Sequence, residues 1–407
     1  MRKKHIFIVV LVWILFLSVA CSKTDIPPIT DNTETPIPTE PEKDPIDELL
    51  KSMSIEEKIG QLLIVGLEGT EISEADKLQI DKNKVGGFIL FSRNIESKNQ
   101  TLDLLNSLKE ENMNNKVPLF LSVDEEGGRV SRLSKIYKNL LEASTLSDKM
   151  DNELSYEYGE ILGVKLSRLG FNLNFAPVMD INSNEDNPVI GDRAYGNTAQ
   201  EVVEIGLEVM KGLKTKNIIP VAKHFPGHGD TSIDSHLDLP IVDKSFEELL
   251  GQELIPFEAA IKNDIGMIMV AHILFPRIDS DNPSTMSNNI IEKILRDKLG
   301  YSGVVVSDDM TMGAIINNFT IEEAAMKFLK SGGDIALVCH GIENPSIVIE
   351  RIKQGIDKNE ISIEEIDKKV YRILKLKNQY KLEDMYINNV DIEDINMRTI
   401  DLNKKLS

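Results

Sequence analysis

The sequence predicts an α/β fold of the (β/α)8 TIM-type barrel class, formed by a single large domain. Eight short runs are almost continuously apolar, and longer amphipathic stretches separate them. Apolar strands that alternate with helices indicate a parallel sheet covered on both faces. Eight such units within residues 46–383 match a (β/α)8 barrel. The apolar runs lie at 61–67, 86–91, 117–123, 171–180, 218–225, 266–273, 303–309 and 334–340.

Helix-like stretches between these runs include 101–113, 199–216 and 320–332. A doubly wound open sheet has the same alternation of strands and helices, so periodicity alone leaves that fold as an alternative. No glycine-rich nucleotide-binding motif follows the first apolar run, which removes the usual support for this alternative.

The first 21 residues have the pattern of a secretory signal. A basic start precedes an apolar run from Ile6 to Leu17, and small residues then lead to Cys21. A cysteine directly after small residues resembles a lipoprotein signal, in which Cys21 becomes the lipidated first residue. Ser18 stands where such signals usually have leucine, and a retained N-terminal helix is the alternative. Both interpretations predict an extracytoplasmic domain attached to the cell membrane.

Residues 22–45 are rich in proline, threonine and acidic side chains, which predicts an unfolded tether. The pattern changes at Ile46, and the spacing of Ser54 and Glu57 is that of a helix capping box. We expect the folded domain over 46–383, followed by a C-terminal extension at 384–407.

The composition is ordinary for a globular protein, with 41% hydrophobic and 28% charged residues. The net charge of −20 argues against nucleic acid as a partner, because phosphate binding requires an excess of Lys and Arg. The one cysteine besides Cys21 is Cys339, which we interpret as a small buried hydrophobic residue.

Polar side chains gather where the predicted strands end. In a (β/α)8 barrel, catalytic groups follow the C-terminal ends of the strands, so this placement predicts an active site. The residues concerned are Asp124, Glu125 and Glu126 after the third run, Asp180 in the fourth, Lys223 and His224 in the fifth, His272 in the sixth, and Asp308 and Asp309 in the seventh.

Three of the six histidines lie in "KHFPGHGDTSIDSH", residues 223–236. One hypothesis is a metal site formed by His224, His228 and His236. The Pro and Gly residues between them oppose a continuous helix, and no glutamate follows His224 as it does in H-E-x-x-H zinc sites. The other hypothesis is proton transfer by His236, with Asp234 orienting its ring. Local spacing alone also allows a simple salt bridge in a loop.

The segment 223–236 resembles the signature of glycoside hydrolase family 3, specifically the β-N-acetylglucosaminidase branch of the bacterial peptidoglycan-recycling type. Five further segments resemble this family and follow in the family's order, so that the resemblance covers about residues 50 to 380. They are "VGGFILFSRN" (85–94), "VDEEGGRVSRL" (123–133), "NFAPVMDI" (174–181), "GDRAYG" (191–196) and "VVSDDMTMGA" (305–314).

The resemblance implies a retaining mechanism with a covalent glycosyl-enzyme, in which Asp308 is the nucleophile and Asp309 the alternative. Strand alternation agrees, since Val304, Val306 and Asp308 share one face. In this branch the acid/base is a histidine, here His236, and Asp234 is its partner.

The resemblance also implies residues that bind the sugar, and it leaves His228 with a structural role in ordering the loop. The sugar-binding residues that it implies are Asp124, Arg132, Arg193, Lys223 and His224.

The implied activity is removal of terminal, non-reducing N-acetylglucosamine from peptidoglycan fragments. We expect no cofactor, no metal and a monomer. Three alternatives remain: a β-glucosidase or xylosidase of the same family, a phosphorylase, and a non-catalytic wall-binding lipoprotein. A β-glucosidase of this family commonly takes its acid/base from a separate domain, whereas here one barrel nearly fills the chain.

Overall fold

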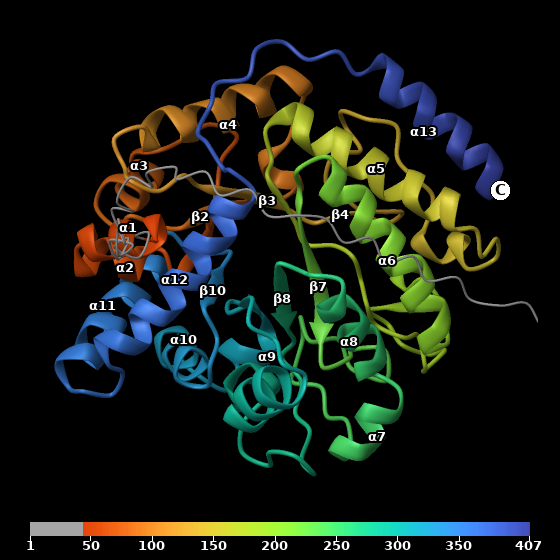
Figure 1. Ribbon diagram of the computed structural model, residues 1–407. Coiled ribbons are helices and arrows are strands. Elements are labelled where there is room, and N and C mark those ends of the chain that lie inside the picture. The colour runs from red at the N-terminus through yellow and green to blue at the C-terminus, as the bar shows by residue number, and fades with distance from the viewer. Residues whose placement is uncertain (1–43) are drawn as a thin grey trace, which may run out of the picture. The chain divides into compact units, whose positions relative to one another are not determined.

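The computed structural model describes residues 44–407, which lie within one compact unit (Figure 1). The predicted signal at 1–21, with Cys21, and residues 22–43 of the predicted tether (22–45) lie outside the described residues. The last two residues of that prediction are folded, since Asp44 caps the first helix, α1, which begins at Pro45. Within 44–407, no helix combines the length and the apolar character needed to cross a membrane.

Eight parallel strands close into a barrel, which confirms the predicted fold class and rules out the open sheet. The first strand, β1, pairs with both β2 and β10, so the sheet has no free edge. Each strand falls within one of the eight predicted apolar runs. In barrel order the strands are β1 (Leu63–Gly66), β2 (Gly87–Leu90), β3 (Phe120–Val123), β6 (Leu173–Asn174), β7 (Ile219–Phe225), β8 (Met267–Val270), β9 (Val304–Asp309) and β10 (Ile335–Val338).

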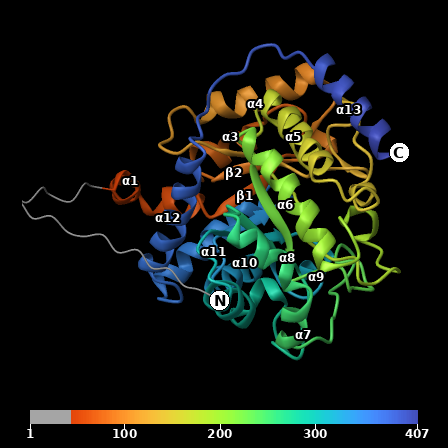
Figure 2. The same cartoon turned by 45° about the vertical axis from the view of Figure 1, so that its right-hand side comes forward.

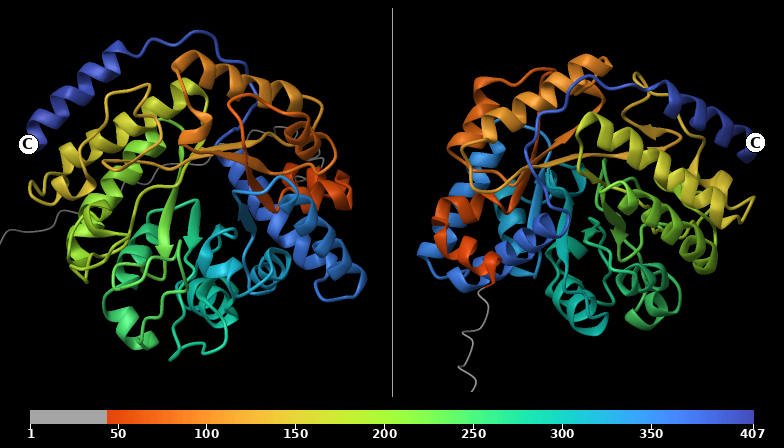
Figure 3. Two further views of the ribbon diagram at one scale, coloured as in Figure 1. Left: turned by 180° about the vertical axis from the view of Figure 1, so that it is seen from behind. Right: turned by 45° about the horizontal axis from the view of Figure 1, so that its top comes forward.

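Helices surround the strands on the outside of the barrel (Figures 1 and 3). The predicted capping box begins α2, where Ser54 Oγ accepts from the Glu57 amide and the Glu57 carboxylate accepts from the Ser54 amide. The helices are α1 (Pro45–Ser52), α2 (Ile55–Gly60), α3 (Glu74–Asp81), α4 (Lys98–Asn112), α5 (Asn152–Leu169), α6 (Ala199–Thr215), α7 (Phe246–Gly251), α8 (Leu254–Lys262), a π-helix (Asn289–Lys298), α9 (Gly313–Ile316), α10 (Ile321–Lys330), α11 (Asn344–Asp357), α12 (Ile363–Gln379) and α13 (Glu393–Leu406).

A small hairpin follows β3 that the sequence pattern did not predict. It pairs β4 (Glu125–Gly127) with β5 (Val130–Ser131). The buried Glu125 carboxylate holds it together by accepting from the Ser131 hydroxyl and from the Arg132 and Leu133 amides. The hairpin therefore forms around a buried polar group, not around an apolar pattern.

The predicted run 171–180 is a strand only at Leu173–Asn174. The Asn174 side chain bonds both the amide and the carbonyl of Glu125, and Pro177 has no amide hydrogen to donate to a neighbouring strand. The rest of this run lies outside a regular strand but stays bonded to β7, through an isolated bridge between Val178 and Lys223.

The N-terminal end of the barrel is closed by a buried lysine. Lys377 of α12 donates from Nζ to Gln61 Oε1 and to the carbonyls of Gly86 and Pro118. Gly86 and Pro118 precede β2 and β3, so this side chain fills the end opposite to the predicted site. The open end is the one at which the strands finish.

The residues of the predicted C-terminal extension pack on the barrel domain. The segment before α13 runs past α4 (Figure 3, right). Lys98 of α4 donates to the Val390 carbonyl, and Asn106 of α4 donates to the Ile387 carbonyl. Helix α13 lies along α5 (Figures 1 and 2), where Arg168 pairs with Asp394.

Candidate active site

One pocket of about 280 Å³ lies at the C-terminal ends of the strands. It brings together all eight side chains that the sequence analysis named as catalytic or sugar-binding. Other lining residues come from β2, β8 and β10 and their following loops. The eight predicted residues in its wall are Asp124, Arg132, Arg193, Lys223, His224, Asp234, His236 and Asp308.

Asp308 and Asp309 differ in what holds them, although they are neighbours in β9. The Asp309 carboxylate accepts from the Thr311 amide (2.9 Å), the Thr311 hydroxyl (2.6 Å) and the Cys339 amide (3.1 Å). Asp308 accepts only from the Asp309 amide, at 2.9 Å, among the bonds within residues 44–407. Asp308 is therefore the carboxylate that remains available to a ligand.

Burial by itself raises the pKa of Asp308, but nearby His272 and His224 outweigh it and hold the pKa below its ordinary value. Asp308 is consequently a carboxylate at neutral pH. His272 also supports the end of β9, because its ring bonds Thr285 Oγ1 on one side and the Asp309 carbonyl on the other.

Asp234 and His236 form a local pair in the loop after β7. The Asp234 carboxylate lies 2.7 Å from His236 Nδ1 and accepts from the His236 amide at 2.9 Å. Burial acts to raise the pKa of Asp234, but these bonds hold it below its ordinary value. With Nδ1 engaged, the ring presents Nε2, and the His236 side chain is 65% exposed. The pair therefore has one ring nitrogen available for proton exchange.

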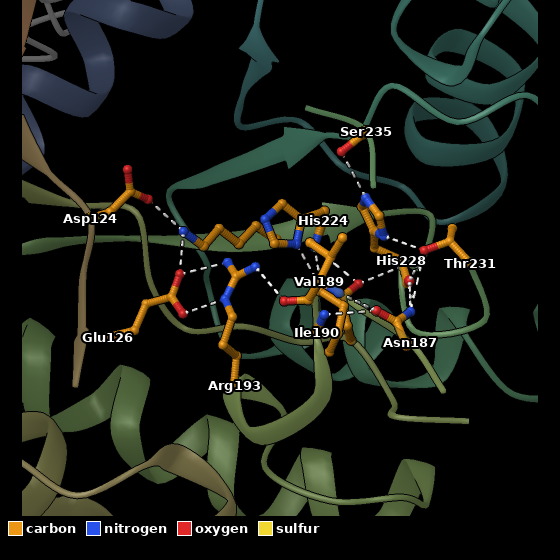
Figure 4. Close-up of polar contacts among 12 residues, drawn as sticks. Asp124, Glu126, Asn187, Val189, Ile190, Arg193, His224, His228, Thr231 and Ser235 are labelled. Atoms are coloured by element: carbon orange, nitrogen blue, oxygen red, sulfur yellow. Dashed lines mark hydrogen bonds and ion pairs between the residues drawn. The ribbon is translucent and has the colours of Figure 1, made fainter. Parts of the chain in front are cut away.

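A cluster of two cations and two carboxylates forms another wall of the pocket. Lys223 Nζ lies 2.6 Å from Asp124 and 2.7 Å from Glu126. The two Glu126 oxygens accept from Arg193 Nε and Nη2, each at 2.8 Å (Figure 4). Burial alone would raise the pKa of Glu126, but Arg193 and Lys223 hold it well below its usual range. Carboxylate partners therefore hold Arg193 and Lys223 in fixed positions in the pocket wall.

The Asp180 carboxylate fixes the backbone of the histidine-rich segment 223–236. Its buried carboxylate lies 2.6 Å from His224 Nδ1 and accepts from the amides of His224 (3.2 Å) and His228 (2.7 Å). Burial opposes ionisation, yet His224 and His228 keep the Asp180 pKa below its ordinary value. The orientation of the His224 ring toward the pocket depends on this carboxylate.

The three histidines of the metal hypothesis are each bonded within the protein. His224 and His236 use Nδ1 toward Asp180 and Asp234. His228 uses both ring nitrogens, toward Thr231 and Ser235. Within the described part of the chain, no three His, Cys, Asp or Glu side chains are grouped so that they could hold a metal ion. His228, with both ring nitrogens engaged, has none left to bind a metal ion, whereas His224 and His236 each keep Nε2.

Sequence reasoning noted Glu126 and Asp180 at strand ends but assigned them no role, and it missed Asn187, Phe91 and His340. Phe91 and His340 line the pocket with ring centroids 5.4 Å apart. The partners of Glu126 and Asp180 lie more than 40 residues away in sequence, so no local spacing could reveal them.

The chain matches the family model "Glycosyl hydrolase family 3 N terminal domain" over residues 54–376. It is 34% identical over 329 residues to "Beta-hexosaminidase A" of Pseudoalteromonas piscicida, covering 74% of this chain and 54% of that protein. It is also 34% identical over 284 residues to a "Beta-hexosaminidase" of Nitrosomonas eutropha, covering 68% of this chain and 80% of that protein.

A solved structure of a family 3 β-N-acetylglucosaminidase from Paenibacillus superimposes with a TM-score of 0.82 at 36% identity. The superposition covers 86% of this chain and 68% of that chain. The closed barrel, the six family-like segments and the matched family model agree over the same residues. This chain therefore belongs to glycosyl hydrolase family 3.

Proposed function

We propose that the protein is a retaining β-N-acetylglucosaminidase that removes terminal, non-reducing N-acetylglucosamine from peptidoglycan fragments. Relatives named β-hexosaminidase and β-N-acetylglucosaminidase support the activity. The observation that carries the proposal is the availability of two groups in one pocket: the Asp308 carboxylate and the His236–Asp234 pair.

The nucleophile in this proposal is Asp308. Its carboxylate attacks the anomeric carbon as the bond to the leaving oxygen breaks, which gives a glycosyl ester on Asp308. The depressed pKa supports this role, because only the ionised carboxylate is nucleophilic. Asp309 is a poor candidate, since its three hydrogen bonds would have to break first.

The acid/base in this proposal is His236. It gives the proton on Nε2 to the leaving oxygen and then takes a proton from the water that attacks the ester, which restores both groups. The other acids that line the pocket support this assignment by being engaged. Asp124 and Glu126 are ion-paired with Lys223, and Asp309 bonds Thr311 and Cys339.

The sugar is held by Asp124, Arg132, Arg193, Lys223 and His224. Arginine and lysine donors fix hydroxyl or acetamido oxygens, and carboxylates accept from hydroxyls. Arg132 supports this role, because its Nε is buried without a hydrogen-bond partner in residues 44–407. A ligand oxygen at that point would supply the missing acceptor.

The proposed location is outside the cytoplasm, with a lipid on Cys21 as the membrane anchor. The signal pattern of residues 1–21 supports this proposal. The location suits the proposed substrate, since a bacterial cell wall lies outside the membrane.

The test of this function is product analysis on nitrophenyl N-acetylglucosaminide and on purified muropeptides, with and without phosphate. The proposal expects free N-acetylglucosamine from both substrates, released first as the β-anomer. Release of the sugar 1-phosphate would show a phosphorylase, and release of glucose or xylose from their own glycosides at higher kcat/KM would show a different specificity. Binding of fragments without turnover would show a wall-binding protein.

A further inference from the structure

Ser235, between Asp234 and His236, is the buried residue of a segment, 232–238, whose other residues are exposed or partly exposed. Its exposed fraction is 2%, whereas Ile233 and Leu237 are 45% and 73% exposed. His236 is exposed as well. The position of the Asp234–His236 pair therefore depends on what holds Ser235.

The first contact of Ser235 is with His228. Ser235 Oγ lies 3.1 Å from His228 Nε2, in the buried interior of the loop (Figure 4). His228 is held on its other side by Thr231, whose Oγ1 lies 2.8 Å from Nδ1. Asn187 donates to the His228 carbonyl and to Thr231 Oγ1, at 2.9 and 3.2 Å. The His228 ring is thus held in place and offers a fixed hydrogen-bond partner to the Ser235 hydroxyl.

The second contact of Ser235 is with the helix that follows the nucleophile strand. The Ala314 amide in α9 donates to the Ser235 carbonyl at 3.1 Å. Backbone packs closely here, since a Cβ at Gly313 would lie 2.5 Å from the His236 carbonyl oxygen. Only glycine leaves room for this approach. The segment is therefore clamped between His228 and α9.

We infer that Ser235 is a positioning residue of the proposed acid/base pair: its hydroxyl on His228 and its carbonyl on Ala314 set where His236 stands relative to Asp308. This inference rests on the proposed function of His236. Ser235 does not touch the reacting atoms. Its effect is on proton transfer, which requires the donor within hydrogen-bond reach of the leaving oxygen.

The consequence is a dependence on the leaving group. A displaced acid slows cleavage of a poor leaving group, which needs the proton, and hardly affects a nitrophenolate, which does not. Misplacement by about 1 Å costs up to roughly 10²-fold in rate. A residue that only stabilised the fold would lower both rates alike.

The test compares kcat/KM for a natural disaccharide and for nitrophenyl N-acetylglucosaminide in Ser235→Ala. We expect a loss of roughly ten- to a hundredfold on the disaccharide and less than about threefold on the nitrophenyl substrate. The matched control is Ser232→Ala, which removes a hydroxyl from an exposed position of the same loop and should change neither value. Equal losses on both substrates in Ser235→Ala, or no loss at all, would overturn the inference.

Two further variants test the clamp from its other sides. Gly313→Ala should push the His236 carbonyl and reproduce the same leaving-group dependence without removing any hydrogen-bonding group. His228→Phe should show the same leaving-group dependence. Adding Ser235→Ala to His228→Phe should lower kcat/KM no further, because both changes break the same bond between Ser235 Oγ and His228 Nε2. Additive losses in the double variant would contradict the contact with His228.

His236→Gly distinguishes a failure of the positioning role of Ser235 from a failure of the proposed acid/base role of His236. If it shows leaving-group dependence and Ser235→Ala does not, the positioning role is wrong and the proposed function stands. If His236→Gly itself shows none, the proposed acid/base is wrong, and the positioning role falls with it.

Discussion

At the scale of residues, the site depends on which polar groups are engaged and which are free. Asp308 and Asp309 share a strand end and a residue type, yet three hydrogen bonds hold Asp309 and a single one from its neighbour's amide reaches Asp308. The same distinction separates His236, with Nε2 available, from His228, with both ring nitrogens bonded.

Trapping the glycosyl-enzyme tests the choice of nucleophile. A slow fluorinated N-acetylglucosaminyl fluoride should label the peptide that contains Asp308, because the ester forms faster than it hydrolyses. Asp308→Ala should lower kcat by roughly 10⁴-fold or more and leave the circular dichroism spectrum unchanged. Mass spectrometry locates the label, and a label on Asp309 would contradict the assignment.

His228 predicts a pH dependence of stability. Burial, followed by the nearby His224, lowers the pKa of His228 from 6.5 to about 4. The unfolded chain therefore takes up this proton first, so the stability is fully present above pH 6.5 and is lost as the pH falls toward 4. The unfolding free energy of the wild type should lose roughly 3 kcal/mol from this group.

Urea titrations at several pH values check this prediction against His228→Gln, which has no such titration. The stability difference between wild type and His228→Gln should narrow as the pH falls from 6.5 to 4. A difference that stays constant over this range would mean that His228 does not remain neutral in the folded protein. His340→Gln, at an exposed ring, is the matched control for replacing a histidine by glutamine.

At the scale of elements, periodicity predicted the barrel because each strand is buried on both faces. All eight apolar runs contain a barrel strand. The hairpin β4–β5 was missed since the buried Glu125 carboxylate, not an apolar pattern, holds it. The predicted run 171–180 is longer than the observed strand because Asn174 and Pro177 interrupt the ladder. The other residues of the run are buried by segments distant in sequence, which is why they are apolar although they form no strand.

The sequence predicted the residues that line the pocket better than it predicted the residues that hold them in place. The residues proposed to contact the sugar stand in local segments such as 223–236, which resemble those of the family. Glu126 pairs with Arg193, and Asp180 with His224, between the ends of neighbouring strands, so their roles appear only when the strands are brought together. Asn187 reaches His228 in the same way.

Helix α13 offers a test at this scale. Its Leu402 is fully buried, whereas Met397 on the same helix is 56% exposed. Leu402→Ala should lower the unfolding free energy by about 2–5 kcal/mol, because it removes buried apolar surface and leaves a cavity. Met397→Ala should change it by about 0.5 kcal/mol or less.

Denaturant unfolding measures both variants, and the kcat of the folded Leu402→Ala protein should equal that of the wild type. Equal stability of the two variants would show that α13 contributes no packing energy. A loss of kcat in folded Leu402→Ala would show that the helix influences the distant pocket.

At the scale of the whole molecule, the barrel has one closed and one open end. Lys377 fills the N-terminal end, and every proposed catalytic and sugar-binding side chain lies at the other. The proposed lipid on Cys21 would hold this domain at the membrane surface through the segment that precedes α1.

Metabolic labelling with a fatty acid tests that attachment. The wild type should take up label, and Cys21→Ser should take up none, because the thiol that carries the lipid is absent. Cys339→Ser is the matched control, since this cysteine is buried in the barrel domain and should not affect labelling. Equal labelling of wild type and Cys21→Ser would contradict the lipoprotein proposal.

The most direct test of a retaining mechanism with His236 as the acid/base is the rescue of His236→Gly by azide. The variant should still form the glycosyl-enzyme from a nitrophenyl substrate, whose leaving group needs no acid, and should then stall because water is not activated. Pre-steady-state kinetics should show a burst of nitrophenol followed by a slow steady rate.

Azide needs no general base, so it should restore turnover and give the β-linked glycosyl azide, the product of two inversions at the anomeric carbon. On a natural disaccharide, His236→Gly should lose roughly 10²–10⁴-fold in kcat/KM. Equal losses on both substrates, with no burst and no response to azide, would contradict a retaining mechanism in which His236 is the acid/base.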